Sequence, residues 1–336
     1  MRAIVVTERG GPEVLTLAER PRPVPGPGEV LVRIAVAGVN YHETYERSGL
    51  YPRRLPYVPG KEAAGTVVAW GEGVTGFEVG DRVCGVDFAG PYAEFALVPA
   101  GRLVPVPPGL SLETTAAVLL QGLTAHFLTA EAYRVRPGDS VLVHAAAGGT
   151  GLILTQVVTL MGGRVIGTVS TVEKEELARA AGAVEVVRYS ETDVVAEVRR
   201  LTDGTGVSAV YDGVGKATFH SSLACLRRRG TLVLYGQASG LVSGFQPQRL
   251  AAGSLTLIRP MLPDFIVADD ELRHRAAQVF TWVARGDLNV RIGGRYGLSE
   301  AGHAHGDLQG RKTSGKLLLI PALDGEEGET SGSTHA

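Results

Sequence analysis

The sequence predicts an α/β fold of two domains, one β-rich and one built on a parallel, doubly wound sheet, and three observations support it. The chain has 336 residues, which is too long for one ordinary core. Its first third alternates short apolar stretches with turns rich in Gly and Pro. After residue 140, apolar strands alternate with helices, and such alternation requires a parallel sheet covered on both faces.

The first third reads as a series of short strands. Turn residues recur about every eight to twelve positions, which is typical of a compact β-rich domain. The strands are expected within residues 3–6, 23–40, 65–74, 81–86 and 92–99. Residues 112–133 have helical spacing instead, and residues 315–321 form an apolar strand that could return to the first domain.

The second part predicts six strands with helices between them. The strands are expected within residues 140–146, 164–170, 184–190, 207–215, 231–237 and 254–260. The helices are expected within residues 152–162, 174–182, 193–204 and 270–288. The pair His303-x-His305 stands in a polar stretch and predicts a surface loop. Residues 324–336 are acidic and lack large apolar side chains, which predicts a disordered tail.

Composition excludes several classes of function. The formal net charge is −2, so neither nucleic acid nor an acidic membrane surface is expected as a partner. No apolar run reaches the ~18 residues that span a bilayer, and the N-terminus does not resemble a signal peptide, so a cytoplasmic protein is expected. Cys84 and Cys225 are too few for a disulfide framework or a four-cysteine zinc site.

The residues after the first long strand do not predict a catalytic zinc site either. Such a site needs Cys and His ligands that converge on one metal. No Cys stands near Asn40, and Gly60–Glu62 carries no histidine, although His42 and Glu43 are close in sequence. We therefore expect no metal, and with it no ordinary alcohol oxidation.

The segment Val141–Gly151, VLVHAAAGGTG, carries the main functional signal. An apolar strand leads into a glycine-rich turn and then into a helix expected to begin near Leu152. Small residues let the backbone approach a pyrophosphate, and the helix N-terminus offers N–H groups and a partial positive charge. The usual G-x-G-x-x-G pattern appears as Ala146-x-Gly148-x-x-Gly151. A second strand follows about twenty residues on, and this context favours a dinucleotide site over a plain tight turn.

The end of that second strand bears on which dinucleotide binds. NAD-specific sites place Asp or Glu there to bind the ribose 2′-hydroxyl. Ser170 stands at this point, and Lys174 follows one turn later. A hydroxyl and a lysine suit a 2′-phosphate and favour NADP(H). The alternative is that Lys174 is an ordinary solvated residue at the start of a helix.

Several segments, in a fixed order, carry a resemblance to a known family. They are GGPEVL (10–15), GVNYHETYERSGLYP (38–52), GKEAAGTV (60–67), GDRV (80–83), QGLTAHFL (121–128), HAAAGGTGL (144–152), VYDGVG (210–215), YGQASG (235–240), IRP (258–260) and TSGKLLLIP (313–321). With them the chain resembles the zinc-free quinone oxidoreductases, the zeta-crystallin-like branch of the medium-chain dehydrogenase/reductase superfamily. The resemblance implies a GroES-like catalytic domain (1–121), an NADP-binding Rossmann domain (122–264) and a return to the catalytic domain (265–323).

The resemblance also implies that NADPH lies in the cleft between the domains and passes a hydride to a quinone. Asn40 and Tyr45 match the segment that lines the nicotinamide end. The other matched cofactor positions are Thr124 near that end, Gly148, Gly149 and Gly151 in the pyrophosphate loop, Ser170, Lys174 and Tyr189 around the 2′-phosphate, Gly236 and Ser239 in the loop over the nicotinamide, and the basic residue Lys316. The match at Lys174 and Tyr189 specifies the dinucleotide as NADPH.

The chain departs from the family pattern near the active cleft. Gln121 stands in place of Lys, Gly213 in place of Ser, Tyr41 in place of Phe, and Tyr235 and Gln237 in place of Phe and Asn. These positions bear on the electron acceptor rather than on the cofactor.

Two functional hypotheses are NADPH-dependent reductases that differ in the acceptor, and a third is a protein that catalyses no reaction. Hydride transfer needs proximity and a dry cleft, and the acceptor is either a quinone or an enone or enoyl thioester. Tyr45 is the expected catalytic hydrogen-bond donor to the acceptor, unless it only packs. Asn40, the second expected catalytic residue, polarises an oxygen or orients the nicotinamide ribose, unless it only ends a strand. The third hypothesis is a protein that binds NADPH without catalysis. Residues 254–260 would form a sheet edge, and pairing of that edge with a second copy predicts a homodimer.

Overall fold

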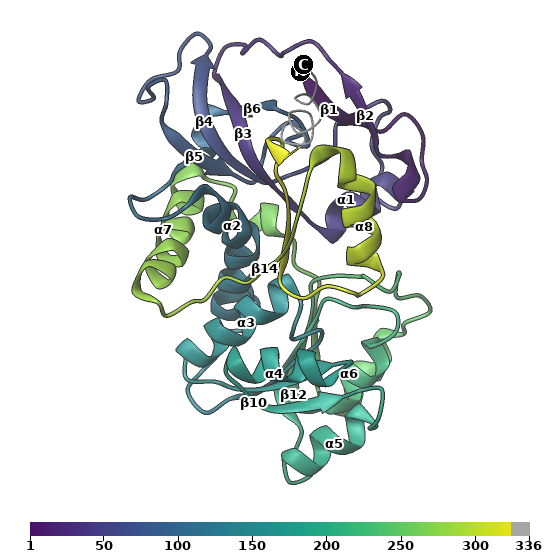
Figure 1. The fold of residues 1–336 in the computed structure, drawn as a ribbon. Coiled ribbons are helices and arrows are strands. Elements are labelled where there is room, and N and C mark those ends of the chain that lie inside the picture. Colours follow the sequence, from purple (N-terminus) through teal and green to yellow (C-terminus); the bar gives the residue numbers. More distant parts are fainter. Residues whose placement is uncertain (324–336) are drawn as a thin grey trace, which may run out of the picture. The chain divides into compact units, whose positions relative to one another are not determined.

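The computed structural model describes residues 1–323, and the tail expected over residues 324–336 lies outside them. Two compact units are present (Figure 1). The first consists of Met1–Leu120 and the chain from Val290 onward, and the second of Gln121–Asn289. Among the described residues, no helix is long and apolar enough to cross a bilayer.

The second unit extends further along the chain than expected. Helix α7 (Asp269–Arg285) belongs to it, whereas residues 265–323 had been assigned to the first domain. Close packing on helix α2 (Leu112–Phe127) accounts for the difference. A Cβ atom on Gly122 would lie 2.5 Å from the Val279 side chain, so the absence of a side chain at Gly122 lets the helices approach.

The first unit is built on a seven-stranded sheet in the order β14-β15-β3-β4-β5-β7, with β6 also paired to β3, and on the separate pair β1-β2. This confirms the β-rich first domain. The strands are β1 (Arg2–Val5), β2 (Thr16–Glu19), β3 (Glu29–Val39), β4 (Ala63–Trp70), β5 (Arg82–Gly85), β6 (Phe95–Pro99), β7 (Val104–Pro105), β14 (Ile292–Tyr296) and β15 (Lys316–Leu319).

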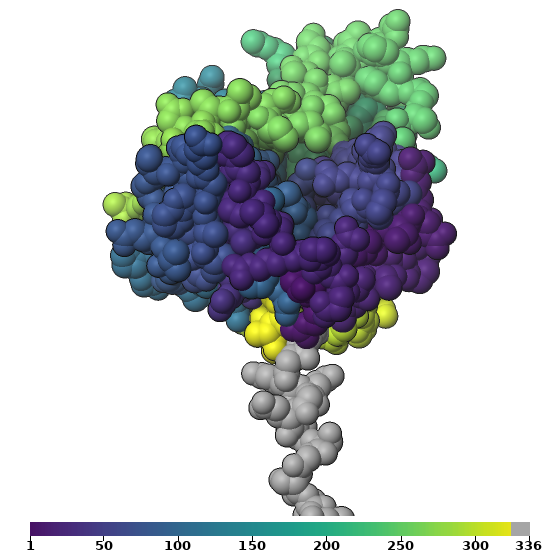
Figure 2. Space-filling model, turned by 90° about the horizontal axis from the view of Figure 1, so that it is seen from above, coloured from purple at the N-terminus to yellow at the C-terminus, as the bar shows by residue number. Residues whose placement is uncertain are grey.

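The C-terminal strand returns to the first unit, as expected. β15 pairs antiparallel with β3, with Leu318 opposite Gly38. The yellow residues that contain it lie against the purple N-terminal residues (Figure 2). The Arg2 guanidinium also donates a hydrogen bond to the Pro321 carbonyl at 3.3 Å. Sequence-distant segments therefore close this unit.

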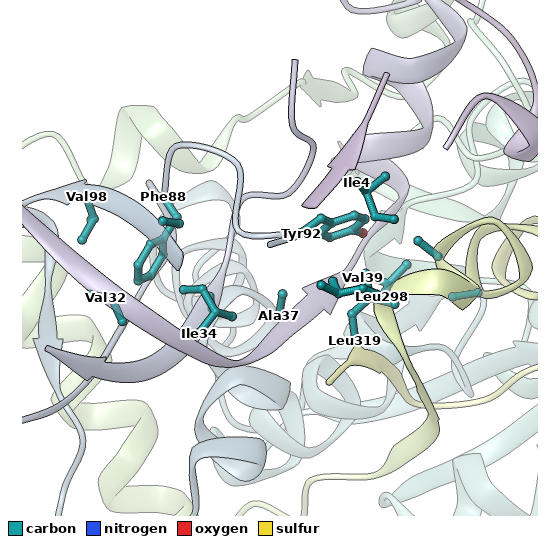
Figure 3. Packing of buried hydrophobic residues seen from close by; sticks show 14 of the residues in the cluster. Ile4, Val32, Ile34, Ala37, Val39, Phe88, Tyr92, Val98, Leu298 and Leu319 are labelled. Carbon is teal, nitrogen blue, oxygen red and sulfur yellow. The ribbon is translucent and has the colours of Figure 1, made fainter. Parts of the chain in front are cut away.

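The core of the first unit follows from alternation along β3. Val32 and Ile34 are buried, whereas Arg33 between them is exposed. Further along the strand, Ala37 and Val39 join the same cluster (Figure 3). Burying each large apolar side chain contributes about 1.5–3 kcal/mol, so this face holds the sheet together.

The first unit contains several short helices, one of which was not expected from the sequence. They are η1 (Pro12–Val14), α1 (Tyr41–Ser48), η2 (Ala100–Arg102), η6 (Leu298–Glu300) and α8 (Ala301–Gln309). The loop expected at His303-x-His305 was wrong, because both residues belong to α8. His305 is fully buried and its Nε2 lies 3.2 Å from the Tyr92 hydroxyl, which points into the core (Figure 3). The helix was not predicted because its histidines and glycines give no apolar periodicity, although one face of it is buried.

The second unit confirms the doubly wound sheet. Its six strands lie in the order β10-β9-β8-β11-β12-β13, and every neighbouring pair is parallel. They are β8 (Ser140–Val143), β9 (Arg164–Val169), β10 (Ala183–Arg188), β11 (Val207–Asp212), β12 (Leu226–Leu234) and β13 (Thr256–Ile258). β12 begins five residues before the expected 231–237, so it includes Arg227 to Arg229. As expected, β13 lies at the edge of the sheet.

Helices follow the strands of the second unit. Helix α2 continues as the π-helix η3 (Leu128–Ala132). The others are α3 (Gly149–Leu160), α4 (Val172–Ala180), α5 (Val194–Leu201), α6 (Phe219–Cys225), η4 (Pro247–Ala252) and η5 (Leu262–Phe265). α3 begins at Gly149 rather than near Leu152, so all its first-turn N–H groups lie within the glycine-rich segment.

Candidate active site

The glycine-rich turn connects the carboxyl end of β8 to the start of α3. Ala145 has a positive φ of 51°, which turns the chain sharply after the strand. The Ala146 N–H donates to the Thr168 carbonyl at 3.1 Å, which ties the turn to β9. Gly148 is the N-cap of α3 and supplies no side-chain hydrogen bond. The first-turn N–H groups of α3 therefore suit an anionic group outside the protein.

Two glycines let this turn close tightly on its own backbone. A Cβ atom on Gly151 would lie only 2.2 Å from the Ala145 carbonyl oxygen, and one on Gly148 would lie 3.2 Å from the same oxygen. Such a cradle admits a pyrophosphate against the backbone, which a side chain at Gly151 would prevent. The geometry fits the dinucleotide expected from the sequence.

The residues expected around a 2′-phosphate come together at the ends of β9 and β10. The Tyr189 N–H donates to the Val169 carbonyl at 3.1 Å, and the Ser190 hydroxyl to the Ser170 carbonyl at 3.0 Å. Lys174 lies in the first turn of α4, where its N–H donates to the Thr171 hydroxyl at 3.3 Å. Tyr189 is 44% exposed. Ser170 and Tyr189 are therefore close together at the carboxyl ends of β9 and β10, and Lys174 lies in the first turn of the helix that follows β9.

The expected nicotinamide loop lies at the ends of β11 and β12. A Cβ atom on Gly236 would lie 2.4 Å from the Gly213 carbonyl oxygen, so the two turns touch through their backbones. The Ser239 hydroxyl donates to the Val214 carbonyl at 2.8 Å and accepts from the Ala217 N–H at 2.9 Å. Ser239 thus fastens the loop within the protein. Thr124 lies half-buried on α2.

Asn40 and Lys316 meet in a buried polar cluster of the first unit. The Lys316 ammonium donates to the Asn40 Oδ1 at 2.6 Å and forms an ion pair with Glu62. The Asn40 Nδ2 donates to the Glu62 Oε1 at 3.0 Å, and the Leu120 N–H donates to the Glu62 Oε2 at 3.1 Å. Glu62 is fully buried and Lys316 is 3% exposed. The cluster orients the carboxamide of Asn40.

Tyr45 lies half-buried on α1, in a group of aromatic rings. Its ring meets that of Tyr51 edge to face, with centroids 5.2 Å apart. The Tyr41 ring is tilted beside it, and the Tyr41 hydroxyl donates to the Leu308 carbonyl at 3.0 Å. The hydroxyl that distinguishes Tyr41 from the Phe of the family pattern therefore anchors α1 to α8.

Within residues 1–323, no three His, Cys, Asp or Glu side chains are grouped so that they could hold a metal ion. Both cysteines are free and buried. Burial raises the pKa of the Cys225 thiol to about 12, so it is not a nucleophile at neutral pH.

Known proteins place these features in a family. A model described as "Alcohol dehydrogenase GroES-like domain" matches residues 26–108, and one described as "Zinc-binding dehydrogenase" matches residues 149–282. A quinone oxidoreductase of Pseudomonas aeruginosa is 44% identical over 315 residues, which cover 93% of this chain and 97% of that protein. The chain belongs to the quinone oxidoreductase family of the medium-chain dehydrogenase/reductase superfamily.

Solved structures of this family share the fold. A mycobacterial protein in complex with NADPH is 51% identical, with a TM-score of 0.93 over 96% of this chain and 100% of that chain. The Escherichia coli quinone oxidoreductase complexed with NADPH is 39% identical, with a TM-score of 0.94 over 96% of this chain and 100% of that chain. A 2-haloacrylate reductase of Burkholderia is 40% identical over 332 residues, which cover 95% of this chain and 98% of that protein.

Two departures from the quinone oxidoreductase pattern are coupled in space. A Cβ atom on Gly213 would lie 2.8 Å from the Tyr235 hydroxyl oxygen. A serine at 213 would therefore require the Tyr235 ring to move. The smaller residue at one position accommodates the larger one at the other, and together they shape the end of the sheet where the quinone oxidoreductase family pattern places the nicotinamide.

Sequence reasoning missed the partners of Asn40 and Lys316. The sequence pattern marks Glu62 only as part of a segment without histidine, and Glu43 only as a neighbour of His42. The Asn40 N–H donates to the Glu43 Oε2 at 2.9 Å, which makes Glu43 part of the same cluster. A pairing of Lys316 with Glu62 joins residues far apart in the sequence, and no local pattern indicates it.

Glu43 makes the stability of the first unit depend on pH. Burial raises its pKa from the ordinary 4.5 to about 7, although His42 and Lys316 oppose the shift. Between these two pH values, the unfolded chain has released a proton that the folded chain keeps. The stability contributed by Glu43 is therefore present below about pH 4.5 and lost as the pH rises to about 7.

Replacement of Glu43 by Gln should accordingly stabilise the protein at pH 8, by on the order of 1–3 kcal/mol. The variant cannot ionise at this position, so its advantage should vanish near pH 5. Urea denaturation of both proteins at pH 5 and pH 8 measures the difference. Glu300→Gln, at the cap of η6 in the same unit, is the control, and an equal response in both variants would contradict the assignment to Glu43.

Proposed function

We propose that this protein is an NADPH-dependent quinone reductase that works without a metal. The observation that carries the proposal is the tight glycine turn at the start of α3. Beside it, the position where NAD-specific sites have an acidic residue is occupied by Ser170, with Lys174 and Tyr189 nearby. Its relatives include a quinone oxidoreductase solved with NADPH. NADPH supplies the hydride when it is bound.

The protein's own residues hold and orient the reactants. The first-turn N–H groups of α3 bind the pyrophosphate, and Ser170, Lys174 and Tyr189 bind the 2′-phosphate. The backbone at Gly236 packs directly on that of Gly213, which fixes the loop that closes over the nicotinamide. Asn40, held by Lys316 and Glu62, presents its carboxamide in one orientation. The Tyr45 hydroxyl donates a hydrogen bond to the acceptor oxygen as negative charge develops there.

A specific observation favours a second candidate, reduction of an activated alkene. The 2-haloacrylate reductase of Burkholderia is similar over nearly the whole chain. A quinone and an activated alkene both accept hydride at a conjugated carbonyl system, so the same arrangement could serve either. The Gly213–Tyr235 pair distinguishes this chain at the acceptor end.

Side-by-side assays decide between the candidates. NADPH consumption is measured with 1,4-benzoquinone, 9,10-phenanthrenequinone, 2-chloroacrylate and crotonyl-CoA, and each assay is repeated with NADH. We expect the quinones to be preferred. Preference for 2-chloroacrylate or crotonyl-CoA would favour the alkene reductase, and NADPH binding without turnover of any acceptor would favour a binding protein.

Tyr45→Phe tests the proton-donating role. We expect the turnover number with quinones to fall at least about tenfold, while NADPH affinity is retained. Tyr51→Phe, which alters the ring packed against Tyr45, is the matched control. Unchanged turnover in Tyr45→Phe would reduce Tyr45 to a packing residue.

Lys174→Ala should lower the affinity for NADPH roughly 10- to 100-fold, because a charged hydrogen bond to the 2′-phosphate is lost. The affinity for NADH, which lacks that phosphate, should be unchanged. Lys312→Ala is the control, since Lys312 is 75% exposed and lies in the other unit. Titration of cofactor fluorescence measures both constants, and equal losses for the two cofactors would refute the role of Lys174.

We also propose that the protein is a cytoplasmic homodimer. On one side of the short edge strand β13, no strand within residues 1–323 pairs with the backbone, and pairing with a second copy would satisfy those groups. Free, buried cysteines suit a reducing compartment such as the cytoplasm.

Light scattering coupled to gel filtration tests the dimer, and a Leu257→Pro change should yield monomers if β13 forms the contact. Cell fractionation tests the location.

A further inference from the structure

His144 lies at the topological switch point of the parallel sheet, where the order in which the chain adds strands reverses. From β8 the chain proceeds through β9 and β10 on one side, and through β11, β12 and β13 on the other. Ligands of doubly wound sheets bind outside the carboxyl ends of the strands at this switch point. His144 directly follows β8 and is 2% exposed. It therefore underlies the expected cofactor site without being open to solvent.

The imidazole joins the two halves of the sheet. Its Nδ1 lies 3.0 Å from the Thr168 hydroxyl on β9, and its Nε2 lies 3.0 Å from the Ser222 hydroxyl on α6. The Ser222 hydroxyl in turn donates to the Asp212 carboxylate at the end of β11, at 2.7 Å. Thr168, Ser222 and Asp212 are all at most 2% exposed. We call these four residues the switch-point network.

Proton counting sets the direction of every hydrogen bond in the network. A carboxylate only accepts, so the single Ser222 proton goes to Asp212. The Ser222 oxygen must then accept from His144, which places a proton on Nε2. Burial lowers the pKa of His144 and keeps the ring neutral, so Nδ1 accepts the Thr168 proton. The geometry thus selects one tautomer of a neutral imidazole.

The network reaches both loops that receive the cofactor. The Thr168 carbonyl accepts from the Ala146 N–H of the glycine turn at 3.1 Å. The Asp212 Oδ1 accepts from the N–H groups of Val214 and Gly215 at 2.8 and 3.0 Å. A shift at His144 would therefore move the pyrophosphate turn and the nicotinamide turn relative to each other.

We propose that the switch-point network sets the spacing of the two cofactor turns, with His144, Thr168 and Ser222 as positioning residues for NADPH. The inference rests on the proposed function. Each hydroxyl is buried, so its loss leaves a ring nitrogen of His144 without a partner, and the ring can then adopt another tautomer or position. Cofactor affinity should respond more than overall stability does.

Thr168→Val and Ser222→Ala remove one side of the network each and keep side-chain bulk close to the original. Thr129→Val is the matched control, because the Thr129 hydroxyl is also fully buried in the second unit and donates to the Ala125 carbonyl at 2.8 Å. We expect the NADPH dissociation constant, measured by fluorescence, to rise about tenfold in both network variants and to stay unchanged in Thr129→Val. The melting temperature should fall similarly in all three.

Nitrogen-15 spectra of the imidazole, recorded without cofactor, give a readout independent of activity. The wild type should show the proton of His144 on Nε2, and Ser222→Ala should shift it toward Nδ1. Network variants that bind NADPH as tightly as Thr129→Val, or a wild-type ring protonated on Nδ1, would overturn the inference. A wild-type protein with the Nε2 tautomer that binds no NADPH would overturn the proposed function and the role of the network in it.

Discussion

Gly151→Ala is expected to raise the NADPH dissociation constant at least about 100-fold, a loss of roughly 2.7 kcal/mol, and to abolish quinone reduction at ordinary cofactor concentrations. The added Cβ would lie 2.2 Å from the Ala145 carbonyl oxygen and 2.9 Å from the Ala146 Cα. Both are backbone atoms, so no change of rotamer relieves the contact. The turn must open, and the N–H groups of α3 then no longer converge on one pyrophosphate.

Gly306→Ala is the control for this substitution. Gly306 lies in α8, and nothing stands within 4 Å of an added Cβ. This change should leave NADPH affinity intact and stabilise the helix by about 0.5–1 kcal/mol. Fluorescence titration and thermal melting of both variants make the comparison. A Gly151→Ala protein that is folded and binds NADPH as tightly as the wild type would refute the role of this glycine turn in binding the pyrophosphate.

Lys316→Met is expected to cost about 3–5 kcal/mol of stability. The substitution keeps the length of the side chain but leaves the Glu62 carboxylate fully buried without its ion-pair partner. It also removes the donor to the Asn40 Oδ1, so the carboxamide can rotate. Catalysis should therefore decline even in the fraction of molecules that stay folded.

A second change separates the charge effect from the packing effect. Lys316→Met combined with Glu62→Gln leaves neither partner of the ion pair charged and should recover much of the lost stability. Lys312→Met, at an exposed pair with Asp307, should change stability little. Urea denaturation measures all of these proteins. Equal stability of Lys316→Met and the double variant would show that the ion pair does not dominate.

Some elements were predictable because their cause is local. The turn at Val141–Gly151 was predictable because small residues between a strand and a helix have one common use. Strand β3 was predictable because apolar residues flank Arg33 on both sides in its middle, and β15 because three leucines follow Lys316 in succession. Helix α8 was not, since His305 is polar in sequence and buried only because Tyr92 meets it.

The sequence by itself determined the fold class and predicted the pyrophosphate turn and the pair Ser170 and Lys174 for a 2′-phosphate, because these depend on spacing within single segments. Only the tertiary structure decided what orients them. Lys316 meets Glu62, Tyr235 covers Gly213, and His144 bridges Thr168 on β9 and Ser222 on α6. These contacts follow from how strands and helices pack, and a charge or hydroxyl acquires its partner only when the fold removes it from water.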